Sequence, residues 1–284
     1  QMPESVRLPV VAGQFYPAGE LALAKQLEEC FLHSLGPGHR PDVIPGGPRE
    51  IVGLICPHAG YAFSGHTAAH AYAALAEDGH PEVAVVVGLN HGRGGFASAV
   101  QTAGAWRTPL GDTAIATDIA EDIAEALPEF TTDPQAFRAE HSIEVQLPFL
   151  QFIYDEALLF VPVMMAEQDA SSARSVGAAI ASALRGRNAV VIASTDMTHY
   201  EPAAVARRQD QLLIRRIEQL DPEGLIAERA ARQITMCGAG PVAATIFAAK
   251  ELGATAAKSL AYSTSGDVMP SPEVVGYYAA VLAR

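Results

Sequence analysis

Short apolar runs alternate along this chain with longer segments in which apolar and polar residues are mixed. The runs are rich in β-branched residues, which is typical of strands. Because the run from Val83 to Val87 contains no polar residue, we expect its strand to be covered on both faces of a sheet. Strands are predicted at 51–56, 83–89, 96–101, 158–163, 189–194, 258–263 and 274–282.

The longer segments carry apolar residues at helical spacing. Their alternation with covered strands predicts an α/β fold, a three-layer α/β/α sandwich around a mainly parallel or mixed central sheet. The pattern shows no break, so we expect a single domain over residues 1–284, with a Gly- and Pro-rich surface loop at 36–48. Helices are predicted at 20–35, 65–77, 118–127, 142–154, 170–185, 203–220, 222–231 and 241–252.

The composition narrows the classes of partner. With 49% hydrophobic and 18% charged residues among 284, the chain is globular rather than disordered. Nineteen Lys and Arg against 32 Asp and Glu give a net charge of −13, which repels phosphate backbones and anionic lipid. Nucleic acid is therefore not an expected partner.

Cysteine usage and hydropathy bear on the cellular compartment. The three cysteines are an odd number at wide spacing, which does not resemble a disulfide framework and favours a reducing cytoplasm. Cys30 and Cys56 are expected to pack as small hydrophobic residues. The longest apolar stretches fall short of the ~18 residues that a membrane-spanning helix needs, so we expect no membrane contact.

Three histidines follow predicted strands closely. His58 follows the strand 51–56, His91 follows 83–89, and Asp196 and His199 follow 189–194. In open α/β sheets, ligands bind outside the carboxyl ends of the strands. A single histidine at such a place would be an ordinary surface residue, but three of them predict a shared site.

A fourth histidine and a cysteine lie at predicted helix starts. His141 precedes the helix 142–154, where it belongs either to the site or to ordinary helix capping. Cys237 precedes a helix that should begin at Pro241, and a helix N-terminus lowers the pKa of a nearby thiol. The alternative for Cys237 is a small thiol packed in the turn.

Two histidines and one anionic ligand from separate loops form the composition of an open mononuclear site for Fe(II), Zn or Cu. A thiolate in place of a carboxylate favours softer ions without excluding iron. Asp196 and His199 would then serve as an outer ligand, an orienting carboxylate or a general base. Four arginines at 207, 208, 215 and 216 are interpreted as a solvated helix face.

Six motifs occur in one order along the chain. They are Ala12-Gly13-Gln14-Phe15-Tyr16-Pro17, Pro57-His58-Ala59-Gly60-Tyr61, Asn90-His91-Gly92, the eleven residues from Glu140 to Leu150, Ser194-Thr195-Asp196-Met197-Thr198-His199-Tyr200 and Cys237-Gly238-Ala239-Gly240-Pro241. Together they resemble the Memo family. Bacterial and archaeal members of that family usually share a gene set, AmmeMemoRadiSam, with an AMMECR1-like protein and a radical SAM protein, which the resemblance implies as partners.

The resemblance also implies roles for individual residues. The Memo family is similar in fold to the class III extradiol (LigB-type) dioxygenases, whose iron is held by two histidines and a glutamate beside an acid/base histidine. By motif, His58 and His91 correspond to the histidine ligands, and Cys237 stands where the dioxygenases have glutamate. His199 resembles their catalytic base and His141 their second pocket histidine. Because a thiolate cannot chelate as a carboxylate does, ring cleavage does not follow from the fold alone.

The function expected from these features is a dioxygenase-like oxidoreductase with Fe(II), or else Cu, acting on a small molecule. A Zn-dependent hydrolase or lyase, with His199 as the base, is the enzymatic alternative. The non-enzymatic alternative is a phosphopeptide-binding or metal-handling protein with a peptide in the metal pocket.

Overall fold

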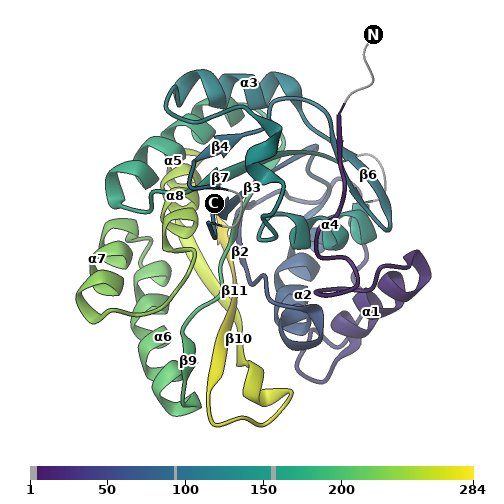
Figure 1. Ribbon diagram of the computed structural model, residues 1–284, viewed down its shortest axis with the longest axis vertical. Coiled ribbons are helices and arrows are strands. Elements are labelled where there is room, and N and C mark those ends of the chain that lie inside the picture. The colour runs from purple at the N-terminus through teal and green to yellow at the C-terminus, as the bar shows by residue number, and fades with distance from the viewer. Residues whose placement is uncertain (1–4, 93–94, 155–157) are drawn as a thin grey trace.

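The computed structural model describes residues 5–92, 95–154 and 158–284. A large mixed sheet runs through the molecule, and helices cover both of its faces (Figure 1). Its strand order is β10-β11-β2-β8-β3-β7-β4, and β9 pairs with β11 outside this path. The strands are β2 (Ile51–Cys56), β3 (Val83–Leu89), β4 (Ala99–Val100), β7 (Leu159–Met165), β8 (Ala189–Ser194), β9 (His199–Glu201), β10 (Ala256–Thr264) and β11 (Val274–Ala283). The three-layer α/β/α fold with a mixed sheet is thus confirmed.

The four central strands, in the order β2-β8-β3-β7, are parallel, and their neighbours on either side are antiparallel. Every residue of β2 and β3 is buried, as expected for strands with helices on both faces. The register pairs Cys56 with Ser194 and Val87 with Ala193, so the carboxyl ends of β2, β8 and β3 meet at one edge. The loops that carry the candidate residues start from this edge.

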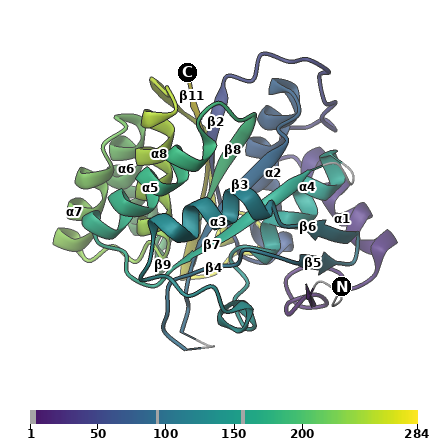
Figure 2. The same ribbon diagram turned by 90° about the horizontal axis from the view of Figure 1, so that it is seen from above.

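The helices form two groups on opposite faces of the sheet. Figure 2 shows α6, α7 and α8 on one side of β2 and β8, and α1, α2 and α4 on the other. On the first face α8 packs on β2, β8 and β3, and on the second α2 packs on β2, β10 and β11. The helices are α1 (Glu20–Leu32), α2 (Tyr61–Asp78), α3 (Thr117–Ala126), α4 (Leu147–Tyr154), α5 (Ala170–Leu184), α6 (Ala203–Glu218), α7 (Pro222–Arg232) and α8 (Ala239–Glu251).

Several short strands differ from the sequence prediction. The strand predicted at 96–101 is reduced to the two residues of β4. A second sheet, in the order β1-β5-β6, was not predicted, because its strands are short and partly polar: β1 (Val6–Arg7), β5 (Ala105–Thr108) and β6 (Gly111–Ala114). Within the described ranges, no helix is both long and apolar enough to cross a bilayer.

Two glycines allow the loops around the candidate site to approach the central strands closely. A Cβ atom at Gly88 would lie 2.5 Å from Ser142 Oγ, and the Ser142 hydroxyl bonds to the main chain of Leu89 instead. A Cβ atom at Gly238 would lie 2.5 Å from the carbonyl oxygen of Ser194. The small size of both residues therefore brings the segment after Glu140 and the segment around residue 237 against the strand ends.

A buried ion pair fastens the N-terminal segment to the segment that carries Glu140. Arg7 Nη1 lies 2.8 Å from Glu144 Oε2, and the exposed fractions of the two side chains are 8% and 0%. The Glu144 carboxylate also accepts from the main-chain N–H groups of Val10 and Val11 and from the Tyr16 hydroxyl. All of these groups donate to the Glu144 carboxylate, so the network depends on the negative charge of Glu144.

Candidate metal centre

His58, His91 and Cys237 come together at the carboxyl edge of the parallel strands. One ligand atom from each of the three lies within 4.8 Å of the other two. His58 Nε2 lies 3.4 Å from Cys237 Sγ, and the rings of His58 and His91 are nearly perpendicular, at 89°, with centroids 5.5 Å apart. A single ion among these three donors would meet two imidazoles and one sulfur.

The loop after β8 holds Cys237 in place through its main chain. The Cys237 N–H donates to the carbonyl oxygen of Asp196, and the Asp196 N–H points at Cys237 Sγ, both at 3.3 Å. The N–H of Gly238 donates to the Thr195 hydroxyl at 2.9 Å. The cysteine, more than 40 residues away in sequence, is thereby fixed beside the end of β8.

Another group of side chains could in principle bind an ion among the described residues: His91, Glu140 and His141. The oxygens of Glu140, however, already accept hydrogen bonds from the main-chain N–H groups of His91, His141 and Ser142 at 2.7–2.9 Å. The same carboxylate faces His91 Nδ1 at 2.9 Å. We therefore favour the group with Cys237, because the Glu140 oxygens of the second group are already occupied by hydrogen bonds.

His141 forms one wall of the site. Its ring stacks on that of His91, with centroids 4.6 Å apart and 17° between the planes, and Phe15 packs on it at 4.6 Å. Burial, with the charges of His58 and His91 adding to it, lowers the pKa of His141 to about 4. At neutral pH His141 therefore presents a neutral ring to the pocket.

Asp196 lies beside His58 and is almost fully buried. Its Oδ1 accepts from the His58 main-chain N–H at 2.9 Å, and its Oδ2 lies 3.8 Å from His58 Nε2. Burial raises the pKa of Asp196, and the hydrogen bond from His58 opposes that rise. The carboxyl thus orients the loop at His58 and lies at the edge of the ligand group.

His199 is half-buried and belongs to neither ligand group among the described residues. Its Nδ1 lies 2.8 Å from the carbonyl oxygen of Thr235, and its main-chain N–H donates to the Thr235 hydroxyl. A carbonyl only accepts, so Nδ1 carries the ring proton and Nε2 is free to take one. The electrostatic influence of His199 contributes to the lowered pKa of His58 and opposes the raised pKa of Asp196.

Two predictions about Cys237 are wrong. The following helix begins at Ala239 and not at Pro241, with Gly238 as its N-cap. The pKa of the Cys237 thiol is not lowered: burial raises it to about 12, the charge of Asp196 adds to the rise, and the hydrogen bond from the Asp196 N–H opposes it. Desolvation outweighs the helix N-terminus at this position.

The ionisation of these groups fits a metal ion. A thiol that coordinates a cation loses its proton, because the ion's charge outweighs desolvation. Burial and the neighbouring His91 lower the pKa of His58 to about 3, so its ring is neutral at physiological pH, as a metal ligand must be. Two imidazoles and one ionisable thiol therefore form a donor set that suits a divalent metal.

Thiol labelling of the metal-free protein should modify Cys237 first. Cys30 and Cys56 lie in the core, 6% and 0% exposed, whereas Cys237 is half-buried at the site. Because the pKa of the Cys237 thiol is raised, its reaction with iodoacetamide at pH 7 should be slow but still faster than that of the other two. Peptide mass spectrometry over time measures the order, and earlier labelling of Cys30 would contradict it.

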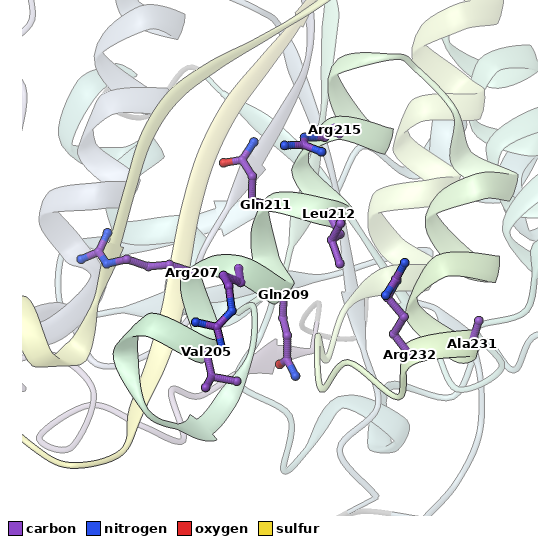
Figure 3. A pocket seen from close by; sticks show the side chains of 9 residues that line it. Val205, Arg207, Gln209, Gln211, Leu212, Arg215, Ala231 and Arg232 are labelled. Carbon is purple, nitrogen blue, oxygen red and sulfur yellow. The ribbon is translucent and has the colours of Figure 1, made fainter.

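A groove of about 950 Å³ lies between α6 and α7 (Figure 3), and none of the candidate metal ligands lines it. Arg207, Arg208, Arg215 and Arg232 line it. Arg207 pairs with Asp267 and Arg232 pairs with Glu228. Part of the positive charge is therefore compensated within this chain, in line with a solvated helix face, and we place no site in the groove.

Comparison with known proteins gives a consistent result over nearly the whole chain. The family model for Memo-like proteins matches residues 7–281. A MEMO1 family protein of Methanopyrus kandleri is 50% identical over 281 residues, which cover 98% of this chain and 99% of the relative. A MEMO1 family protein of Methanothermobacter thermautotrophicus is 46% identical over 275 residues, covering 96% of this chain and 98% of the relative.

Among solved structures, an uncharacterized protein of Escherichia coli K12 is similar in fold. The alignment covers 80% of this chain and 99% of that protein, with a TM-score of 0.51 and 15% sequence identity. At this identity the likeness concerns the fold alone.

Proposed function

We propose that this chain, which belongs to the Memo-like protein family, binds one metal ion through His58, His91 and Cys237. We further propose that it is a dioxygenase-like oxidoreductase. The family resemblance of the six motifs is confirmed by the family match and by the relatives. The observation that carries the proposal is the convergence of two imidazoles and one thiol within 4.8 Å at the carboxyl edge of the sheet.

Iron(II) is the metal that we propose, with copper or zinc as alternatives. Two histidines and one anionic ligand with open positions are the pattern of non-haem Fe(II) oxygenases. When bound, such an ion would supply one-electron chemistry at the site. The thiolate would replace the usual carboxylate, so we propose the class of reaction and not ring cleavage of a catechol.

The remaining residues have complementary roles in this proposal. His199, with Nδ1 fixed by the carbonyl of Thr235, is the base that accepts a proton at Nε2. His141, held between His91 and Phe15, supplies a neutral wall and a hydrogen-bonding nitrogen for a small substrate. Asp196 orients His58 and adds negative charge at the edge of the site.

The partners and the cellular location also belong to the proposal. The proposed ligand of the site is a small molecule or a peptide, since His58, His141 and Asp196 are buried whereas His91 is exposed. The AMMECR1-like and radical SAM proteins that the family resemblance implies are proposed as partners. The proposed location is the cytoplasm, which keeps thiols such as Cys237 reduced.

Metal analysis after anaerobic purification tests the proposal. The protein should contain close to one iron per chain, and the Cys237→Ser variant, purified in parallel, should contain much less. Stoichiometric zinc without iron would replace the oxidoreductase by the hydrolase or lyase. A wild-type protein that retains no iron, zinc or copper would favour a peptide-binding role and contradict the proposal.

A further inference from the structure

The Nδ1 atoms of the two histidines of the candidate metal centre contact different supporting groups. His91 Nδ1 lies 2.9 Å from both oxygens of Glu140, whereas His58 Nδ1 lies 2.9 Å from the Ser194 hydroxyl oxygen. Glu140 is 4% exposed and Ser194 is fully buried. A carboxylate therefore supports one imidazole and a neutral hydroxyl supports the other.

The proton of the Ser194 hydroxyl is committed elsewhere. This hydroxyl donates to the carbonyl oxygen of Ser142 at 2.7 Å, and its oxygen accepts from Gln146 Nε2 at 2.9 Å. Having only one proton, Ser194 Oγ can only accept from His58. The ring proton of His58 is therefore on Nδ1, and the lone pair of Nε2 faces Cys237 Sγ at 3.4 Å.

The orientation of the Gln146 amide supports this assignment. Its Nε2 also donates to the carbonyl oxygen of Pro57 at 3.0 Å, a contact that only the nitrogen can make. On the other side, Oε1 accepts from the Tyr72 hydroxyl at 2.6 Å. The amide is thus fixed at both ends, and it fixes the hydroxyl of Ser194 in turn.

Glu140 acts in the same way on His91. Three main-chain N–H groups, those of His91, His141 and Ser142, donate to its two oxygens. Both oxygens of Glu140 thus accept from N–H donors, and His91 Nδ1 lies 2.9 Å from each of them. A carboxylate in this position accepts from His91 as well, which puts the ring proton of His91 on Nδ1 and leaves Nε2 free.

We propose that Glu140 and the pair Ser194–Gln146 are positioning residues that preset both imidazoles for metal binding at Nε2, with His91 as the stronger donor. The inference rests on the proposed metal site. A carboxylate behind a ligating histidine fixes its tautomer and raises its basicity, whereas a neutral hydroxyl fixes the tautomer alone. The site is therefore expected to be asymmetric, with the charged support on His91.

Metal titration of matched variants tests the inference. Loss of such a supporting partner typically weakens metal binding by about 10- to 100-fold. Glu140→Gln should weaken Zn(II) binding by an amount in the upper part of this range. The NH2 group of the glutamine would face main-chain N–H groups that now donate to a carboxylate oxygen, and two donors cannot bond to each other. Ser194→Ala should weaken binding by roughly 10-fold, because it removes a neutral support.

The chain supplies close controls for both variants. Glu77 bonds to His39 Nε2 at 2.8 Å on the exposed end of α2, so Glu77→Gln breaks a carboxylate–histidine pair away from the site. Ser263 is buried and its hydroxyl lies 3.2 Å from His66 Nε2, so Ser263→Ala removes a serine–histidine contact elsewhere. Both controls should bind Zn(II) as tightly as the wild type does.

Nitrogen-15 NMR of the metal-free protein provides a readout that general destabilisation would not change. Wild-type His58 and His91 should both carry the ring proton on Nδ1, and Ser194→Ala should shift only His58 toward the other tautomer. Wild-type affinity in either site variant, or a ring proton on Nε2 of the wild-type histidines, would overturn the inference. A wild-type protein with both Nδ1–H tautomers and no metal affinity would instead contradict the proposed function.

Discussion

Replacing Cys237 with Ser, or His58 or His91 with Ala, should weaken metal binding by about 100-fold or more. Apparent binding free energies of roughly 10–16 kcal/mol for four-ligand zinc sites correspond to about 3 kcal/mol per ligand, or about two powers of ten. The loss at Cys237 should be the largest of the three, because the thiolate is the only anionic donor in the ligand group. Anaerobic isothermal titration with Fe(II) and Zn(II) measures the change.

His199→Ala is the matched control for these three variants. His199 is held by Thr235 and lies outside the ligand group, so its removal should change metal affinity by less than about 10-fold. The order of affinities decides between the two sets of residues. If Cys237→Ser bound metal as tightly as the wild type while His199→Ala did not bind, His199 would be a ligand and Cys237 a packing thiol.

Glu144→Ala should lower the free energy of unfolding by about 3–5 kcal/mol. The substitution leaves the charge of Arg7 buried and unpaired, and breaking a buried pair in this way typically has that cost. The N–H groups of Val10 and Val11 and the Tyr16 hydroxyl also lose their acceptor. In thermal unfolding of the metal-free protein, the midpoint should fall by roughly 10 °C.

A surface ion pair provides the comparison for this second prediction. Arg187 pairs with Asp118, and the exposed fractions of the two side chains are 48% and 62%. Asp118→Asn should change the free energy of unfolding by less than about 1 kcal/mol, because exposed pairs contribute little. An equal effect of Asp118→Asn and Glu144→Ala would show that burial of the Arg7 pair has no special importance.

The long central strands could be predicted from the sequence because burial on both faces leaves a continuous apolar run. The predicted bounds of β2, β3 and β8 agree with the structure. Elements that depend on tertiary contacts could not be predicted. β9 consists of three residues that pair with β11, and β1 forms only where Val6 and Arg7 meet β5.

The predicted helix bounds agree less well with the structure than the predicted strand bounds do. The second helix begins at Tyr61, four residues before the predicted start, because the turn at Gly60 and not the apolar spacing sets its first residue. The helix after Cys237 likewise begins earlier than Pro241 suggested. A proline fits any of the first positions of a helix, so it marks the first turn and not the first residue.

Much of the candidate site was visible in the sequence, because parallel strands bring the loops at their carboxyl ends together. His58 and His91 follow strands that flank β8, and the structure brings both close to Cys237. The supporting residues were not identified. Glu140 resembles an ordinary helix-capping residue in the sequence, and the contact of Ser194 with His58 depends on the register of β2 and β8.

The pKa of Cys237 shows a further limit of sequence reasoning. The helix that follows the residue is visible in the sequence and favours a thiolate. The burial of the thiol and its proximity to Asp196 are properties of the folded chain, and they raise the pKa instead. A local motif therefore gave the wrong sign, because desolvation depends on the whole environment.

X-ray absorption at the zinc edge of the Zn(II)-loaded protein tests the central claim, the ligand set, most directly. The proposed site predicts one sulfur at about 2.3 Å and imidazole nitrogens at about 2.0–2.1 Å. The sulfur signal should disappear in Cys237→Ser. A wild-type spectrum with nitrogen and oxygen ligands alone would contradict the claim and move the metal to the group formed by His91, Glu140 and His141.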